Sequence, residues 1–524
     1  MRLITMDTQL INNDKGTYQV GLSNIKEAVI SEHFMHKISH NMSLSLYADQ
    51  YFNNNSLKVP TNTVIDNILP ILIESSNSFI SSRTNSAESR ARKYFREYML
   101  NTQHELSVEH IISELMLDQQ FYKGSKKNIS RHKLSLKVKG LIEQRKPINL
   151  IIPALPFKSS CPLKCRGPNP DLSEVSFLLG LSEVAKSIDT IYKKYINTDK
   201  NMSKFSVICD GKRFNKELNE ASNNINNYQN SLRLWVNKLN IMNYVEILDY
   251  EESILNKLNK TIYENKLKTK KQTRDKYTSL LLPIFDPYNI DKTIKKAIEI
   301  DPDPEATNND GRFIPLFRSL LYIINYKCLL NYSKNNNVNY NDLYREISRR
   351  MFKPYCRLSK KEINYIKSGL ESNSMLESSR DQIFEFLRLS ILEEAWYAAI
   401  NYIAEIKSDR DLDSDPVSSC FPDHIRWTIH SKPGQLALLY PTTNGHPVQA
   451  WHGSAIFKRN KKNKIKLYTA PCLSIESEGG IPVSTVLNQS SEQPLFYIHP
   501  NIEFIDFYDF ICKLSENYSR ARKT

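Results

Sequence analysis

One loop of the sequence carries three cations within nine residues. Lys158, Lys164 and Arg166 lie in the segment 153–171, together with two serines and five prolines. Cationic and hydroxyl donors suit a phosphate or a carboxylate, and proline limits the freedom of the loop before a ligand binds. We therefore expect these three cations to bind an anion, with Ser159 as an added donor. An ordinary surface loop rich in turn residues is the alternative.

A carboxylate follows a second apolar run, in the sequence Asp-Gly-Lys-Arg-Phe at 210–214. Asp210 could orient a cation or accept a proton from an amine. It could equally cap the turn that follows it. We take Asp210 as the candidate orienting base and Arg213 as a candidate substrate-binding residue.

Two imidazoles flank a guanidinium in the segment 421–430. Strand alternation places His424, Arg426 and His430 on one face. An imidazole has an ordinary pKa of about 6.5 and can transfer protons near neutral pH, and an arginine can bind a carboxylate through two hydrogen bonds. We expect His430 to shuttle protons and Arg426 to bind the substrate carboxylate, unless His430 merely hydrogen-bonds within a sheet. His424, roughly 20 Å away along the strand, is expected to be a bystander.

A further imidazole stands in the sequence Trp451-His452-Gly453. His452 is a second candidate substrate-binding residue and could take the place of His430 as proton shuttle. Histidine-only zinc is disfavoured, because no ligand pair has helical or zinc-knuckle spacing. Cys161 and Cys165 open a radical iron–sulfur motif, but its third cysteine is absent. Neither common glycine-rich phosphate motif occurs, so we expect no metal and no cofactor.

Hydrophobic periodicity predicts the elements that would position these residues. Apolar runs predict three strands, at 148–152, 205–209 and 245–249. Helices are predicted after Asp171, which forms a capping box with Glu174, and after Lys216. This alternation predicts a parallel sheet with the two helices as crossovers. Loops at the carboxyl ends of such strands line the ligand crevice, which is where the cationic loop and Asp210 would meet.

Beyond this sheet the sequence predicts mostly helices between about 256 and 420, including one over 381–404. A β-rich block follows, with strands predicted at 424–430, 435–440, 449–457 and 464–468. Residues after about 486 are expected to form a short extension.

Composition excludes several classes of protein. With 524 residues and 40% hydrophobic residues the chain is not of the disordered class. The net charge of +14 suits a nucleic acid, an anionic membrane or a phosphorylated substrate. No zinc-finger, basic-zipper or RNA-recognition motif accompanies the charge. The eight cysteines are too scattered for a disulfide scaffold, and no apolar run approaches 18 residues. We expect a cytoplasmic protein with neither a nucleic-acid nor a membrane partner.

Four segments, in this order, resemble the isocyanide synthase family, which comprises bacterial isonitrile synthases of the pyoverdine/paerucumarin type and the yeast dityrosine spore-wall enzyme. They are Pro-Phe-Lys-Ser-Ser at 156–160 with the downstream Pro-Asp pair, the segment 210–214, the segment 421–430 and Trp-His-Gly at 451–453. The resemblance covers about 105–485. The chain departs from the bacterial pattern in a long N-terminal segment, an enlarged middle and Ser-Cys where bacterial members typically carry Pro-Asn.

The resemblance implies an α/β fold, with a Rossmann-like parallel sheet core, helical insertions and a C-terminal β-rich block. The implied organisation is an N-terminal extension of unknown role at 1–104, a catalytic domain at 105–485 with a helical insertion at about 256–375, and a C-terminal extension at 486–524. Lys158 lies in the best-matching segment and is expected, with Asp210 and His430, to be catalytic.

The resemblance also implies a lyase or transferase that works without metal or oxygen. The amine of an aromatic L-amino acid, Tyr or Trp, condenses with the ketone of ribulose 5-phosphate, and a sugar carbon becomes the isonitrile carbon. A downstream oxygenase would act on the product. The spore-wall branch instead implies N-formyltyrosine. The alternatives are another phosphosugar- or amino-acid-transforming enzyme on the same scaffold and, in a different class, a basic nucleic-acid-associated protein.

Overall fold

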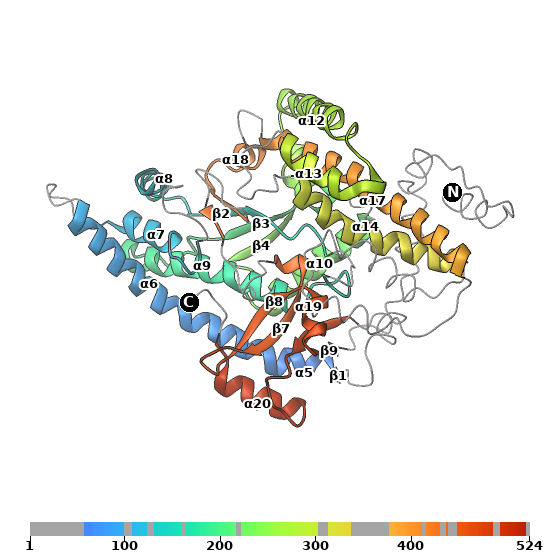
Figure 1. Cartoon of the computed structure of the whole chain (residues 1–524). Coiled ribbons are helices and arrows are strands. Elements are labelled where there is room, and N and C mark those ends of the chain that lie inside the picture. Colours follow the sequence, from blue (N-terminus) through green and yellow to red (C-terminus); the bar gives the residue numbers. More distant parts are fainter. Residues whose placement is uncertain are drawn as a thin grey trace.

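The computed structural model of the chain describes residues 57–98, 107–122, 130–158, 164–215, 222–301, 313–336, 377–410, 415–429, 436–438, 448–485 and 493–519. Two sheets organise these residues (Figure 1). The first is parallel throughout and has the strand order β4-β3-β2-β5-β6. Its strands are β2 (Leu150–Pro153), β3 (Phe205–Cys209), β4 (Val245–Asp249), β5 (Ile425–Thr428) and β6 (Leu436–Ala437).

The three strands predicted from apolar runs lie parallel in this one sheet, as expected. Helices α9 (Leu172–Ile196) and α10 (Ser222–Lys238) connect them as crossovers. The capping box that opens α9 is present: the Asp171 side chain accepts from Ser173 N at 2.7 Å, and the Glu174 side chain accepts from Asp171 N at 2.9 Å. The sequence therefore specifies both the sheet and the start of its first crossover helix.

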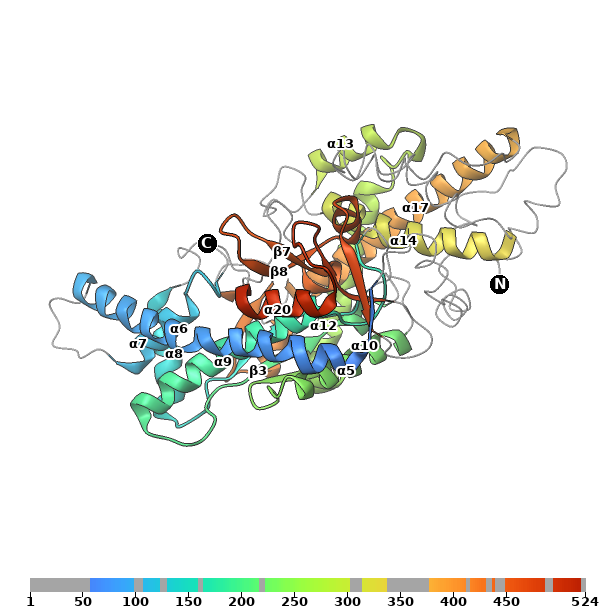
Figure 2. The same ribbon diagram turned by 90° about the horizontal axis from the view of Figure 1, so that it is seen from below.

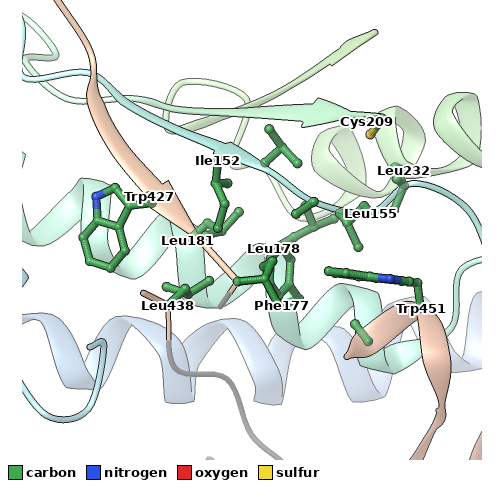
Figure 3. Close-up of a cluster of buried hydrophobic side chains, with 14 of the residues drawn as sticks. Ile152, Leu155, Phe177, Leu178, Leu181, Cys209, Leu232, Trp427, Leu438 and Trp451 are labelled. Atoms are coloured by element: carbon green, nitrogen blue, oxygen red, sulfur yellow. The ribbon is translucent and has the colours of Figure 1, made fainter. Parts of the chain in front are cut away.

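The two faces of the parallel sheet bury different side chains. Ile152, Leu178 of α9 and Trp427 belong to the main core on one face, shown in Figure 3. On the other face, Ile151 packs in a cluster with Val417 and with Tyr250 of α11 (Tyr250–Ser253). Both faces are covered, which explains why the strands are continuous apolar runs in the sequence rather than alternating ones.

The second sheet is mixed and has the order β1-β9-β10-β7-β8. Its strands are β1 (Leu57–Val59), β7 (Ser454–Arg459), β8 (Ile465–Ala470), β9 (Ile481–Thr485) and β10 (Pro494–Ile498). The expected β-rich block is thus divided between two sheets. The middle strand, β10, falls in the segment expected to be a C-terminal extension, and β1 falls in the expected N-terminal one. Both segments contribute to the fold.

Two groups of helices lie at opposite ends of the molecule, with the two sheets between them (Figures 1 and 2). In one group, α6 (Leu69–Tyr98) and α7 (Val108–Met116) pack against α9, and α8 (Arg131–Glu143) packs against α7. The other consists of α12 (Lys260–Leu281), α13 (Ile290–Ile300), α14 (Phe313–Asn336) and α17 (Glu377–Arg410). Trp396 of α17 is fully buried there between Phe285, Phe313 and Phe317, with ring centroids 4.7–5.0 Å apart. Within the described residues, no helix is both long and apolar enough to cross a membrane.

Candidate functional site

The carboxyl edge of the parallel sheet brings two of the expected segments into contact. The loop after β2 turns through Leu155, whose φ of 55° lies in the left-handed region that is costly for leucine. It then passes Gly211, in the 3-10 turn η3 (Gly211–Phe214) that follows β3, so closely that a Cβ there would stand 2.0 Å from the Pro156 carbonyl oxygen. Asp210 is half-buried beside this contact, and its carbonyl accepts from Arg213 N at 3.1 Å.

Lys158, two residues after Pro156 in this loop, lies in a fully buried charged cluster. Its Nζ lies 2.8 Å from Asp171 Oδ2 and 2.9 Å from Glu174 Oε2, and none of the three side chains is exposed. Tyr228 of α10 donates to Glu174 Oε1 at 3.1 Å. The Lys158 ammonium is buried and paired with two carboxylates of the protein, which is a different environment from the phosphate contact that the sequence predicts.

Burial and charge act in opposite directions in this cluster. Burial raises the pKa of Glu174 to about 8, against the effect of Lys158. Burial alone would lower the pKa of Lys158, but Asp171 and Glu174 outweigh it and raise that pKa above its ordinary value. The ammonium therefore stays charged, and the cluster ties the loop after β2 to the start of α9.

The other two cations of the loop reach two further elements. Lys164 Nζ donates to Ser319 Oγ of α14 at 2.7 Å. Arg166 Nε donates at 2.6 Å to Oε1 of Glu476, in α19 (Cys472–Ser477), and its Nη2 pairs with the other carboxylate oxygen. Lys158, Lys164 and Arg166 thus contact three different helices, and these contacts do not bring them to one anion.

Arg213 is enclosed as well. Its Nε donates to Glu405 Oε1 of α17 at 2.8 Å, and its guanidinium lies over the rings of Phe214 and Tyr250, at 4.9 and 5.5 Å from their centroids. Neighbouring Lys212 pairs with Asp249 at 3.2 Å. Because its side chain is 10% exposed, Arg213 is positioned mainly by other protein groups.

Arg426 lies opposite Ile151, on the face of the sheet that α18 (Pro416–Cys420) covers. Its Nε donates to Asp415 Oδ2 at 2.9 Å, and Asp415 caps α18. Ion pairing with Arg426 holds the pKa of Asp415 below its usual range, although burial opposes this. The sequence predicts that Arg426 binds the carboxylate of the substrate. In the structure it binds a carboxylate of the protein, that of Asp415. His424 precedes β5, at the opposite edge of the sheet from Asp210.

The Trp-His-Gly segment approaches the loop after β2 from the second sheet. The Trp451 ring packs edge-on against Phe177 of α9, with centroids 6.0 Å apart, and Figure 3 shows it beside Leu155. His452 is half-buried next to it. A Cβ on Gly453 would stand 2.7 Å from the Ala470 carbonyl oxygen, so only glycine lets this segment lie against β8. The packing of Trp451 and the close fit of Gly453 thus fix the backbone on both sides of His452.

Two expected site residues, Ser159 and His430, lie outside the described residues. Sequence reasoning missed the carboxylates that pair with the motif cations: Glu174, Glu405, Asp415 and Glu476. Of these four, only Glu174 was marked by a local sequence pattern, the capping box that it forms with Asp171. Across the part of the chain that the structure describes, no three His, Cys, Asp or Glu side chains are grouped so that they could hold a metal ion.

The chain is similar to known proteins over part of its length. The family model described as pyoverdine/dityrosine biosynthesis protein matches residues 138–312, which include the segments 156–160 and 210–214 and continue through α12 and α13. An L-tryptophan isonitrile synthase, AmbI1 of Fischerella ambigua, is 30% identical over 104 residues, or 20% of this chain and 30% of that protein. An L-tyrosine isonitrile synthase of Xenorhabdus nematophila is 31% identical over 93 residues, or 18% of this chain and 26% of that protein.

The match thus spans less than a third of the length of these curated relatives. Among solved structures, the PvcA protein of Pseudomonas aeruginosa aligns with a TM-score of 0.40 at 16% identity, over 74% of this chain and 100% of that one. The resemblance to the isocyanide synthase family that the motifs indicated is confirmed.

Proposed function

We propose that this relative of the isocyanide synthases is an enzyme that converts an aromatic L-amino acid and ribulose 5-phosphate to an isonitrile. One observation carries the proposal. Segments that bear the resemblance, though far apart in the sequence, lie together at the carboxyl edge of the parallel sheet: Pro156 touches Gly211, and Trp451 packs on Phe177 beside Leu155. That edge is where open α/β sheets bind their ligands.

The chemistry that we propose begins with loss of a proton from the amino-acid ammonium group, because only the free amine can attack the sugar ketone. Asp210 orients this group, and an imidazole, His430 or His452, accepts the proton and later delivers protons to leaving oxygens. We further propose that Ser159 and Lys164 contribute donors to the phosphate, while Lys158, Arg166, Arg213 and Arg426 position the loops on which the substrates bind.

The burial of the motif cations favours an enzyme over a nucleic-acid-associated protein. A binder of nucleic acid presents its cations on an exposed surface. The side chains of Lys158, Arg166, Arg213 and Arg426 are instead 0–15% exposed, and each pairs with a carboxylate of the protein. We propose a cytoplasmic location and a downstream oxygenase that consumes the product.

The test is incubation of the purified protein with Tyr, Trp or Phe and uniformly ¹³C-labelled ribulose 5-phosphate, followed by mass analysis. An isonitrile should gain one labelled carbon, and an N-formyl amino acid would differ from it by one water. The formyl product would identify the spore-wall type of reaction. Failure to consume the phosphosugar with any aromatic amino acid would exclude the proposed function.

A further inference from the structure

Helix α17 contacts the side chains of Arg213 and Phe214, the last two residues of the segment 210–214. Arg213 donates through Nε to Glu405 Oε1 at 2.8 Å, and its Nη2 donates to the Glu405 carbonyl oxygen. The Phe214 ring stacks on the Tyr402 ring, with centroids 4.3 Å apart and planes 19° apart. Tyr402 and Glu405 are three residues apart on one face of α17. Two consecutive motif residues are thus held by one face of a single helix.

Glu405 is itself fixed from a second helix. Lys266 and Lys270 of α12 place their Nζ atoms 3.0 Å from Glu405 Oε1 and 2.6 Å from Oε2. Lys266 also donates to Ser408 Oγ at 3.2 Å, and the Ser408 hydroxyl donates to the Glu405 carbonyl oxygen at 2.7 Å. The carboxylate therefore has a defined orientation before it meets Arg213.

Arg213 and Asp210 belong to the same turn, and a backbone hydrogen bond links them. Arg213 N donates to the Asp210 carbonyl oxygen at 3.1 Å, and Gly211, between them, has the Pro156 carbonyl against it. A shift of Arg213 would therefore move the backbone that carries the Asp210 carboxylate. Strand β3 holds one end of this turn, and the side chains of α17 hold the other end through Arg213 and Phe214.

We infer that Tyr402 and Glu405 of α17 are positioning residues that set the location of the Asp210 carboxylate at the substrate amine. The inference rests on the proposed function, which places Asp210 beside that amine. Under it, the helical region between β4 and β5 takes part in the reaction by fixing the turn after β3. Misplacement of a reacting group by about 1 Å can cost on the order of 100-fold in rate.

The test compares four variants of the full chain. Glu405→Gln removes the charge that pairs with Arg213, and Tyr402→Leu removes the ring that stacks on Phe214. Tyr402→Phe keeps the stacking ring and should restore activity. Glu385→Gln is the matched control, because it breaks an ion pair with Arg388, with an N–O distance of 2.6 Å, on the same helix but away from η3.

Two readouts separate the inference from the proposed function. The first is hydrogen–deuterium exchange over residues 205–215 without substrates, which should become at least about 10-fold faster in Glu405→Gln and Tyr402→Leu and stay unchanged in Glu385→Gln. The second is turnover, where kcat should fall about 10- to 100-fold while KM for ribulose 5-phosphate changes less than about 2-fold.

Each outcome decides one point. Exchange and kcat equal to those of Glu385→Gln in both variants would overturn the inference. A wild-type chain without turnover would count against the proposed function, and unchanged exchange over 205–215 would then still overturn the inference. If Glu405→Gln fails to fold, Tyr402→Leu and Tyr402→Phe are compared instead, and equal exchange and kcat in these two variants would overturn the inference.

Discussion

Gly211 and Pro156 touch across the carboxyl edge of the parallel sheet: a Cβ on Gly211 would stand 2.0 Å from the Pro156 carbonyl oxygen and 3.0 Å from Ile225. The two residues follow neighbouring strands, β2 and β3. The contact joins the loop that leads to Lys158 with the turn that carries Asp210. A glycine is needed here because of this close approach of backbone to backbone.

Gly211→Ala should therefore separate the two loops. The obstacle is a backbone carbonyl and not a flexible side chain, so the strain should cost about 1–3 kcal/mol or more in free energy of unfolding. Turnover should fall with it. Urea denaturation and a turnover assay check both effects.

Gly140→Ala is the matched control for this substitution. Gly140 lies in helix α8 with nothing within 4 Å of its Cβ position. Alanine there should stabilise the protein by about 0.5–1 kcal/mol. If the two variants had the same stability, the Pro156 contact would not be tight in solution.

Lys158→Met should destabilise the fold strongly. The substitution leaves Asp171 and Glu174 buried without their cation, and breaking a buried pair in this way costs about 3–5 kcal/mol. Glu174→Gln should cost less, because the amide oxygen can still accept from Lys158 and from Asp171 N, and the ion pair between Lys158 and Asp171 remains. Urea denaturation at pH 7 measures both.

Lys146→Met is the control for the loss of a lysine. Its ion pair with Asp423 is solvent-exposed, at 42% and 56% for the two side chains, so its loss should lower the free energy of unfolding far less than the loss of Lys158 does. A lysine that bound phosphate directly would behave differently. Lys158→Ala would then weaken use of ribulose 5-phosphate by about 10-fold or more with little loss of stability, which would contradict the positioning role.

The sequence predicted the parallel sheet because both of its faces are buried. Apolar runs bounded by polar residues mark β2, β3 and β4, and the capping box marks the start of α9. These are local patterns, and the structure confirms them. The same patterns did not tell which sheet a strand joins: β5 continues the parallel sheet, whereas β7 pairs antiparallel with β8.

The environment of the motif cations could not be predicted in this way. Arg213 and Glu405 are 192 residues apart, and Arg166 and Glu476 are 310 apart. A cation that binds a ligand and a cation that binds a remote carboxylate have the same local sequence. Only the folded chain distinguishes them, and it places a protein carboxylate against Lys158, Arg166, Arg213 and Arg426.

Glu405 should make stability depend on pH in the acid range. Burial raises its pKa, but Arg213, Lys266 and Lys270 outweigh burial and lower it to about 2, from 4.5. Between these values the unfolded chain binds more protons than the folded one, so stability rises with pH. The contribution, on the order of 3 kcal/mol, is complete above about pH 4.5 and is lost as the pH falls through 2.

Glu405→Gln should accordingly flatten the pH dependence of the free energy of unfolding between about pH 2 and 4.5. Glu264→Gln serves as the control, since Glu264 forms an exposed pair with Lys260 at 3.9 Å and is 62% exposed. Its slope should match that of the wild type. Identical slopes for Glu405→Gln and the wild type would show that the cations do not hold Glu405 in its charged form.

His430→Gln should abolish most turnover, whereas His424→Gln should leave it nearly intact. Strand β5 ends at Thr428, on the sheet edge that carries Asp210, and His430 comes two residues later in the sequence. His424 precedes β5, where Ile425 N donates to the Asn149 carbonyl oxygen at 2.8 Å, and burial lowers the pKa of His424.

Loss of a positioned proton-transfer group typically costs about 10²–10⁴-fold in rate. Measurement of kcat for both variants, with far-ultraviolet circular dichroism as a check on folding, tests the assignment. Equal activity of His430→Gln and the wild type would transfer the role to His452, and His452→Gln would then have to show the same loss.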